Sequence, residues 1–421
     1  MSAEWLNPRF VAARCVTCAR EWPPPDFPFT CPYCGPLMGT MDIIYDFRKL
    51  RAELPSGPFA RDLWEWKDFL PVEPPESVRI LPVGATPLIS SDELAAKVGV
   101  KQLWLKDDRL NPSASLKDRA SALALAHAIH VNAAVIAAAS TGNAASSLAT
   151  LAAACKMRVV LFVPEAAPEA KLAQLLLHGA HVLRIQGTYD DAFDLCAEVC
   201  RKRGWYSRNT ATNPMLAEGK KTVVLESISQ LEGEVPDVVM VPVGDGCILA
   251  GAHKAFLDLK DAGFVRKIPR LFGVQASGAS LLVEASKKTN PFPVKASVST
   301  FADSIRVGLP RDQVKALRAI RDASGEWVAV SDDAIRSAMR LLAQTVGMFA
   351  EPAGAAALAG LMEARERGLI HEKETALVLV TGHGLKDVKA ALSAAPVAPQ
   401  AVAPTLEAVE TALETEIKHN S

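Results

Sequence analysis

The sequence lacks any apolar run long enough to cross a lipid bilayer. Its longest runs, AAVIAAAS from residue 133 and ALVLVT from residue 376, fall far short of the roughly 20 residues that a membrane-spanning helix needs. It also lacks an excess of charge of either sign, because 46 Lys and Arg residues balance 47 Asp and Glu residues to a net charge of −1. The composition therefore gives no electrostatic reason to expect nucleic acid or a membrane as a partner.

The first ten residues, MSAEWLNPRF, lack the basic and then apolar pattern of a secretory signal. We therefore expect a cytoplasmic protein, in a reducing compartment where disulfides are rare and the eight cysteines are metal ligands or free thiols. With 49% hydrophobic and 22% charged residues, the chain has the composition of a globular protein. Its 421 residues are enough for a large core and for more than one domain.

Four of the cysteines form two CxxC pairs near the N-terminus. Twelve residues separate the first pair, Cys15 and Cys18, from the second pair, Cys31 and Cys34. Two such pairs supply the four thiolates of a tetrahedral zinc site, in a segment too short for a core of its own. The alternative is redox chemistry, but a redox-active CxxC usually occurs singly beside a βαβ pattern. The spacing predicts a zinc-ribbon-like segment over residues 1–40 with structural zinc.

A regular alternation of short apolar strands and helices follows a segment, residues 40–100, that is rich in proline and tryptophan. We expect that segment to be extended and to dock its aromatic side chains on a larger body. The alternation predicts an α/β fold of two doubly wound parallel sheets. Its expected strands are 133–139, 158–163, 181–185, 237–243, 270–276 and 376–380. The expected domains are a large one (41–127 and 216–395), a small one (128–215) and a flexible C-terminal tail (396–421).

Three of the expected strands end in loops of small residues, where ligands of open α/β sheets gather. The first loop, Ser140 to Asn143, offers backbone N–H groups and a helix N-terminus to an anion. The second, GDG from Gly244, has the general form of a phosphate site, although GxGxxG and a Walker lysine are absent. The third begins at Thr381 in TGHGLKD. Each loop alone can be a tight turn, but three together exceed what turns require.

Lys117 stands at the start of an expected helix, where the helix dipole disfavours an ammonium group. A surface lysine is the simple interpretation, and a reactive amine that works as a neutral base is the other. One lysine, one phosphate site and one carboxylate site are what pyridoxal phosphate and an amino-acid substrate need. The residues therefore predict a pyridoxal-phosphate enzyme with a small-molecule substrate.

Five motifs resemble those of fold-type-II pyridoxal-phosphate enzymes, of the tryptophan synthase β-like type, and in particular of the threonine synthases. They are LNPSASLKDRAS, ASTGNAASSLA, VPVGDGCILAG, EPAGAAALAGL and TGHGLKD, in that family's order over residues 80–390. An N-terminal ribbon with two CxxC pairs is also similar to that of many threonine-synthase-like proteins. The resemblance implies a homodimer that converts O-phospho-L-homoserine to L-threonine, in amino-acid biosynthesis.

The resemblance also implies a role for individual residues. Lys117 would bind the cofactor covalently and transfer protons, Asn143 would donate to its 3'-oxygen, and Thr381 would face its ring nitrogen. The backbone of the glycine loop would bind its phosphate, through Gly244, Asp245, Gly246, Cys247 and Ile248. The substrate carboxylate would be held by Ser140, Thr141, Gly142 and Ala144.

Three positions depart from the family pattern. Asp245 and Cys247 stand where asparagines are usual, and Leu216 in NPMLAEGKKT replaces an arginine that binds the substrate phosphate. Lys220, Lys221 and Arg208 are the cations that can take over from that arginine. His383 either lines the site or serves the turn of TGHGLKD.

Other functions stay open from the sequence. A β-replacement enzyme, similar to cysteine or cysteate synthase, and a threonine or serine dehydratase would keep the cofactor and change the substrate. A non-catalytic scaffold whose ribbon recruits a partner is the alternative of another class.

Overall fold

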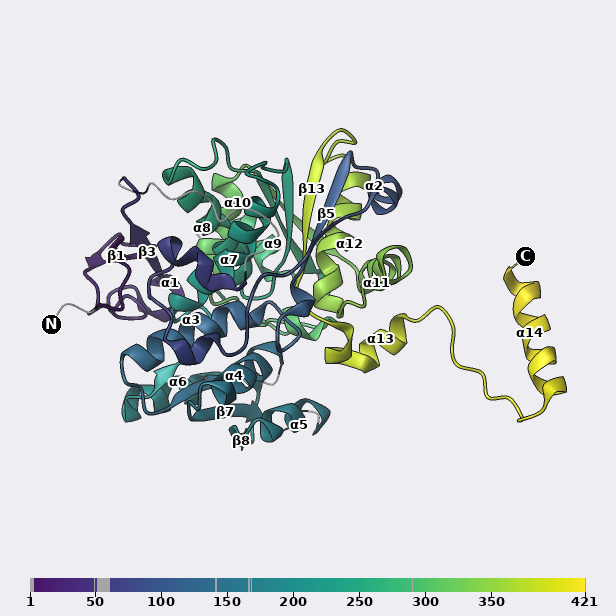
Figure 1. Ribbon diagram of the computed structural model, residues 1–421, viewed down its shortest axis with the longest axis horizontal. Coiled ribbons are helices and arrows are strands. Elements are labelled where there is room, and N and C mark those ends of the chain that lie inside the picture. The colour runs from purple at the N-terminus through teal and green to yellow at the C-terminus, as the bar shows by residue number, and fades with distance from the viewer. Residues whose placement is uncertain are drawn as a thin grey trace.

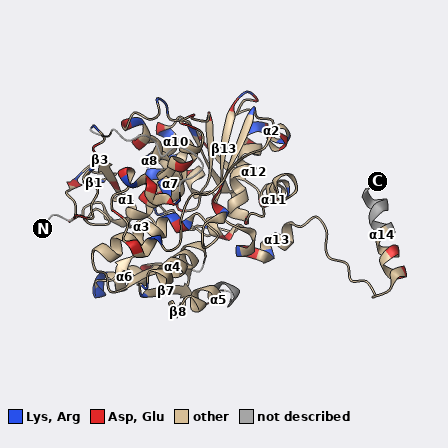
Figure 2. Cartoon of the chain, viewed as in Figure 1, with Lys and Arg blue, Asp and Glu red and all other residues tan. Residues whose placement is uncertain are grey.

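The computed structural model describes residues 4–48, 50, 61–140, 142–165, 167, 169–289 and 291–420, with residues 169–171 and 414–420 described by their backbone alone. Figure 1 shows two α/β units, a small β-structure near the N-terminus and a helix that projects on the C-terminal side. Basic and acidic residues are distributed together over the same helices and loops (Figure 2). Among the described helices, none has the length and apolar character needed to cross a membrane.

The larger sheet has the strand order β12–β11–β10–β13–β5–β4. Five strands are parallel, and only the edge strand β4 pairs antiparallel, with β5. Their bounds are Leu88–Ser90 (β4), Gln102–Asp107 (β5), Val238–Pro242 (β10), Arg270–Ala276 (β11), Glu326–Val330 (β12) and Thr375–Val380 (β13).

Helices cover both faces of the larger sheet, so its strands are buried on both sides. Alternate residues of one strand, such as Val239 and Met240, belong to two different hydrophobic clusters. One cluster includes α3 (Lys117–His130), α7 (Met215–Gln230), α8 (Cys247–Asp261) and α10 (Gln313–Asp322). The other includes α2 (Asp92–Val98), α11 (Asp332–Val346) and α12 (Pro352–Glu366). Burial of both faces explains why the inner strands β10 and β13 are nearly continuous apolar runs.

The smaller sheet, ordered β8–β7–β6–β9, is entirely parallel. Its strands are Ile136–Ala139 (β6), Val159–Pro164 (β7), His181–Ile185 (β8) and Tyr206–Ser207 (β9). Its helices are α4 (Asn143–Ala154), α5 (Glu169–Leu177) and α6 (Tyr189–Arg203). Because α3 packs on both α4 and α7, it joins the two sheets. The predicted fold of doubly wound parallel sheets is confirmed.

One expected strand begins later than the sequence suggested. The stretch 133–139 contributes only Ile136–Ala139 to β6, because Ala133 closes the end of α3 through its N–H to the carbonyl of Ala128 (2.9 Å). The hydrogen-bonding groups of this residue are therefore used by the helix end rather than by the ladder.

The N-terminal segment is a three-stranded antiparallel sheet, β2–β1–β3, made of Phe10–Cys15 (β1), Glu21–Trp22 (β2) and Met41–Tyr45 (β3), with the short α1 (Gly35–Met38). It docks on α10, where Asp42 pairs with Arg318 (2.5 Å) and Lys315 (3.2 Å). The expected extended connection includes the 3₁₀ turns Leu63–Phe69 (η1) and Glu76–Arg79 (η2). Its Trp64 and Trp66 are buried, as expected of docked aromatics.

The remaining elements are short or lie at the C-terminal side. They are η3 (Asp108–Leu110), η4 (Ser277–Ala279), α9 (Leu281–Ser286), η5 (Asp303–Ile305), η6 (Gly384–Asp387), α13 (Val388–Ala394) and α14 (Leu406–Asn420). Helix α14 follows an extended connection and projects away from the body of the molecule (Figure 1).

Candidate active site

A cavity lies where the carboxyl ends of β10 and β13 meet the first turns of α3, α8 and α12. It encloses about 480 Å³, part of which is open to solvent. Its lining comes from segments far apart in the sequence: Lys117, Thr210, Lys220, Pro242, Val243, Gly244, Asp245, Gly246, Cys247, Ile248, Ser304, Ile305, Glu351, Ala353 and Thr381. Lys117, the whole glycine loop and Thr381, three of the groups predicted from sequence, therefore face one space.

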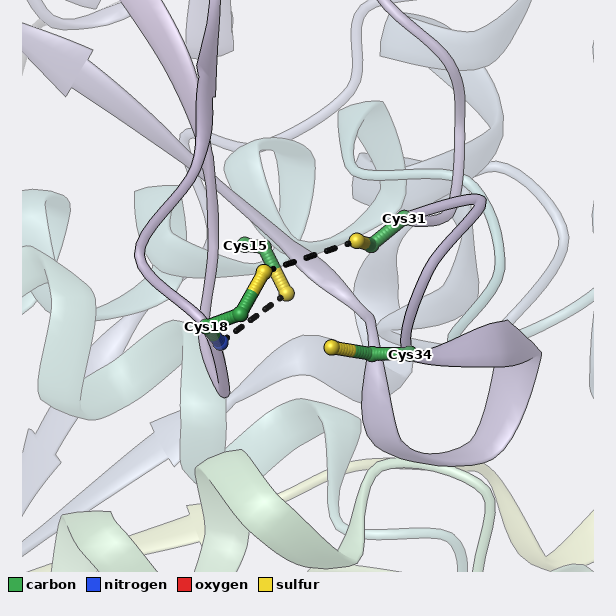
Figure 3. Close-up of side chains that lie close together, drawn as sticks. All are labelled: Cys15, Cys18, Cys31 and Cys34. Atoms are coloured by element: carbon green, nitrogen blue, oxygen red, sulfur yellow. Dashed lines mark hydrogen bonds between the residues drawn. The ribbon is translucent and has the colours of Figure 1, made fainter.

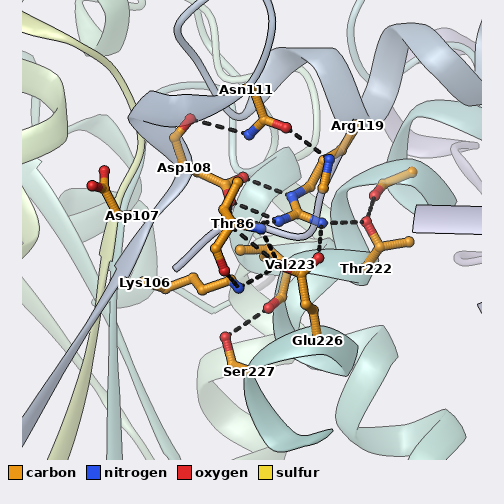
Figure 4. A network of polar contacts seen from close by, with 12 residues as sticks. Thr86, Lys106, Asp107, Asp108, Asn111, Arg119, Thr222, Val223, Glu226 and Ser227 are labelled. Atoms are coloured by element: carbon orange, nitrogen blue, oxygen red, sulfur yellow. Dashed lines mark hydrogen bonds and ion pairs between the residues drawn. The ribbon is translucent and has the colours of Figure 1, made fainter. Parts of the chain in front are cut away.

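Lys117 begins α3, and the loop before it is fastened to the end of β13. The N–H of Leu116 donates to the carbonyl of Thr381 (2.9 Å), and Ser115 forms an antiparallel bridge with Gly382. Two residues after the lysine, the buried Arg119 pairs with Asp108 (2.7 Å) and Glu226 (2.9 Å). Figure 4 shows this network, which links the first turn of α3 to α7 and to the end of β5. The lysine thus projects from a helix start that is held on two sides.

The amine of Lys117 is easier to deprotonate than an ordinary lysine. Burial lowers its pKa to about 8, and the positive charges of Lys220 and Arg208 act in the same direction. The carboxylate of Glu351 opposes them. The neutral fraction near physiological pH is therefore larger than that of an ordinary lysine, which favours a nucleophilic amine.

The glycine loop between β10 and α8 admits no larger residue at its second glycine. Gly246 has a φ of +101°, and a Cβ there would lie 2.7 Å from the Cβ of Ala316 and 3.1 Å from the carbonyl oxygen of Asp312. The first amides of α8 have no partner within the helix and are available to an anion. The loop therefore has the geometry that the sequence predicted for a phosphate site.

Asp245, the carboxylate in this loop, is held by a cation. Its Oδ1 accepts from the backbone N–H of Arg311 (3.2 Å), and the guanidinium lies 3.9 Å away while pairing with Asp190 (2.6 Å). Burial raises the pKa of Asp245, which also favours its neutral form. The repulsion between this side chain and a phosphate is thereby reduced.

Cys247 begins α8 and lies against Thr210, with 3.3 Å between its Sγ and the hydroxyl oxygen. Burial raises the pKa of the thiol to about 12. A thiol that stays protonated is a poor nucleophile, which supports the interpretation of Cys247 as a small packing residue.

Asn143 connects the smaller sheet to the cavity. It begins α4, and its Nδ2 donates to Oε1 of Glu351 (2.7 Å) and to Oγ of Ser304 (3.3 Å), both of which line the cavity. The neighbouring residues Ser140, Gly142 and Ala144 are half-buried in the same loop but are not among the lining residues. Thr141 lies outside the described residues.

Several lining residues were missed from the sequence. Glu351 and Ala353 lie in EPAGAAALAGL, a motif that was singled out without a role for its members. Thr210 lies in a turn and Ser304 and Ile305 lie in the short η5, without a distinguishing sequence pattern, and only the fold could have found them.

The structure separates the three cations that can replace the arginine absent at position 216. Leu216 is buried in the hydrophobic core, and Lys221 is paired with Glu218 and Asp258 away from the cavity. Lys220 is the one that lines the cavity.

The third cation, Arg208, and the ring of His383 lie outside the cavity lining. Arg208 is buried nearby and donates from Nε to Ser121 (3.2 Å). His383 accepts from the N–H of Leu385 (3.1 Å) and packs edge-on against Phe349, so it serves the turn.

The four N-terminal cysteines come together at the tip of the small β-structure (Figure 3). Their sulfur atoms all lie within 4.8 Å of one another, and all four are free thiols. The amides of Thr17 and Cys18 point at the Sγ of Cys15 at 3.4 and 3.5 Å, as in metal-binding knuckles. The cluster is compatible with a zinc-ribbon-like segment.

Comparisons with known proteins agree with this geometry. Residues 80–382 match the family model described as pyridoxal-phosphate dependent enzyme. The threonine synthase of Methanocaldococcus jannaschii is 35% identical, over 90% of this chain and 94% of that protein. That of Methanosarcina acetivorans is 36% identical, over 89% of this chain and 92% of that protein.

Solved structures show the same fold. The T.th. threonine deaminase has a TM-score of 0.61 at 26% identity, covering 71% of this chain and 92% of that one. Maize serine racemase has a TM-score of 0.63 at 20% identity, covering 80% of this chain and 93% of that one. The chain therefore belongs to the family of pyridoxal-phosphate dependent enzymes and, within it, to the threonine synthases.

Proposed function

We propose that this enzyme converts O-phospho-L-homoserine and water to L-threonine and phosphate, with pyridoxal phosphate bound at Lys117. The observation that carries the proposal is the meeting of the Lys117 amine and the glycine loop in one cavity, in a chain 35% identical to a threonine synthase over 90% of its length. A non-catalytic scaffold has no need of this arrangement.

The residues of the cavity fit the cofactor. They include the Lys117 amine, whose pKa is lowered, and a glycine loop in which Gly246 leaves no room for a Cβ. The buried Lys220 lines the same cavity as that loop. When bound, pyridoxal phosphate supplies a ring that stabilises negative charge on the carbon next to the substrate amine.

In this proposal each group of the chain would act on the cofactor or on the substrate. Lys117 Nζ would hold the cofactor aldehyde and, once the substrate amine had displaced it, would take the proton from the substrate α-carbon and return protons later. Asn143 would donate to the 3'-oxygen, and the hydroxyl of Thr381 would face the ring nitrogen. The backbone of residues 244–248 would bind the cofactor phosphate, and that of residues 140–144 would bind the substrate carboxylate.

Four finer points belong to the same proposal. The Cys15, Cys18, Cys31 and Cys34 thiolates hold a structural zinc ion, for which their mutual distances are suitable. The domain limits stay as given from the sequence, except that β3 extends the N-terminal segment from residue 40 to Tyr45. The enzyme works as a homodimer and in the cytoplasm.

A second candidate keeps the cofactor and changes the substrate. The buried Leu216 removes the arginine expected for the substrate phosphate, and the fold of a threonine deaminase matches at 26% identity. Both observations favour a threonine or serine dehydratase, and the first also favours a β-replacement enzyme acting on O-phosphoserine.

A substrate panel on the cofactor-loaded enzyme separates these candidates. We expect phosphate release from O-phospho-L-homoserine with L-threonine as the product, and slow or no formation of oxo-acid from threonine or serine. Turnover of O-phosphoserine alone, or of threonine to an oxo-acid alone, would reject the threonine synthase proposal.

A further inference from the structure

Five lysine and arginine side chains are among the largest that are fully buried, and they divide into two groups. Lys106, Arg119 and Lys221 each form ion pairs with buried carboxylates, as Figure 4 shows for the first two. Lys220 and Arg208 form no ion pair with any residue in the described part of the chain. A buried cation without a counter-charge is costly, and burial accordingly lowers the pKa of both groups. An anion bound beside them would stabilise their charged forms.

Lys220 is 1% exposed and nevertheless lines the cavity. It lies on α7, and its Cβ sits against Gly251 of α8, where an added Cβ would come within 3.0 Å. Across the described residues, its amine has neither a hydrogen-bond nor an ion-pair partner. Lys220 shares the cavity lining with residues 244–248 of the glycine loop. The amine therefore stands beside the start of α8, inside the cavity.

Arg208 adds a second positive charge at this place. Its Nε donates to Ser121, while its Nη2 is buried and has no partner among the described atoms. It lies outside the cavity lining, and its positive charge contributes to the lowered pKa of both Lys117 and Lys220. By contrast, Asp245 is already engaged by Arg311. Two unpaired cations beside the free amides of a helix start favour a ligand with two negative charges.

We infer that Lys220, supported by Arg208, binds a phosphate monoester dianion in this cavity. This inference rests on the proposed function. In it, Lys220 supplies the positive charge for phosphate binding that Leu216, in the place of an arginine, cannot supply. Two molecules of the proposed reaction carry such a group, the cofactor and O-phospho-L-homoserine. Lys220 lies one helical turn after Leu216 on α7, so the charge is supplied from the same helix.

The first experiment uses the cofactor-free protein and three variants. Lys220→Met removes the charge at similar size, Lys220→Arg keeps the charge, and Lys260→Met is the control at the exposed far end of α8. Since Lys220 has no partner to lose, we expect Lys220→Met to keep or raise the melting temperature of the cofactor-free protein. Inorganic phosphate should raise that temperature in the wild type, the control and Lys220→Arg, and less in Lys220→Met.

Binding and kinetics then assign the phosphate. If the cofactor's phosphate is the ligand, Lys220→Met weakens pyridoxal phosphate binding about ten- to hundred-fold, measured by absorbance, and leaves binding of pyridoxal unchanged. If the substrate's phosphate is the ligand, cofactor binding is retained and KM for O-phospho-L-homoserine rises by a similar factor at saturating cofactor.

Two results would overturn the inference. One is a Lys220→Met protein that binds both phosphates like the wild type. The other is a Lys220→Met protein that melts earlier without cofactor and loses pyridoxal and pyridoxal phosphate equally, which would make Lys220 structural. Failure of the proposed function is a separate outcome, because then the wild type itself would not turn over O-phospho-L-homoserine.

Discussion

Replacing Gly246 by alanine tests whether the shape of the glycine loop holds the cofactor. The matched control is Gly263→Ala, since Gly263 also has a positive φ (+81°) and follows the other end of α8, but nothing lies within 4 Å of the added Cβ. Both variants carry the cost of an L-residue at positive φ, about 1 kcal/mol. Only the Gly246 variant adds a clash, at 2.7 Å from Ala316 and 3.1 Å from Asp312.

The clash gives the magnitude of the expected difference. Overpacking of this kind costs about 1–3 kcal/mol, so Gly246→Ala should lose about 2–4 kcal/mol of unfolding free energy against about 1 kcal/mol for the control. The atoms that would have to move include the backbone of Asp312, whose N–H donates to the carbonyl of Asp245 (3.0 Å). The loop itself should therefore shift, and the affinity for pyridoxal phosphate should fall more than ten-fold in this variant alone.

Urea unfolding of the cofactor-free proteins and titration with pyridoxal phosphate measure the two effects. Equal losses of stability and of cofactor affinity in both variants would show that positive φ is the whole effect. In that case the close approach of α10 to the loop would have no part in cofactor binding.

Three further predictions concern other parts of the molecule. Lys117→Ala should abolish borohydride-stable attachment of the cofactor and lower turnover about 10²–10⁴-fold, and a cofactor adduct found on another lysine by mass spectrometry would contradict the assignment. Metal analysis should find about one zinc per chain, reduced in Cys34→Ser together with a lower melting temperature, whereas a metal-free wild type with full stability would exclude structural zinc. Glu226→Gln should cost about 3–5 kcal/mol, because Lys106 and Arg119 lose their shared carboxylate in a buried site. Those two cations lower the pKa of Glu226 in the folded protein to about 2. The stability that the Glu226 carboxylate contributes should therefore be complete above pH 4.5 and be lost as the pH falls toward 2. A Glu226→Gln variant whose stability changes with acid pH as in the wild type would refute this prediction.

The sequence predicted strands well where they are short runs of apolar residues. Strand β11, buried along nearly its whole length, has the bounds expected from RLFGVQA. The partly exposed β8 also has the bounds expected from HVLRI. Strand β5 was missed, because Lys106 and Asp107 make its second half look like a surface segment. Both residues are in fact buried, and Lys106 is satisfied by Glu226, which lies 120 positions away. No local sequence pattern can predict an ion-pair partner so far away in the chain.

The same distinction applies to the site. The sequence singled out Lys117, residues 244–248 and Thr381 because a helix start or a strand end marks them locally, and the fold places them in one cavity, while their individual roles stay predictions. Glu351 was not assigned, because its partner Asn143 is 208 positions away in the other sheet. Lys220 and Lys221 are adjacent lysines, so the sequence could not tell them apart. Only the structure shows that Lys221 is paired with carboxylates and that Lys220 is not.

The position of β13 has a consequence for how the enzyme is made. This strand is near the end of the chain, yet it lies between β10 and β5 in the middle of its sheet. A ribosome-bound chain that has not yet released residue 381 lacks both the central strand and one wall of the cavity. Coenzyme capture must therefore await the translation of β13 and Thr381, and products truncated before them should be colourless, however much vitamin B6 the cell contains.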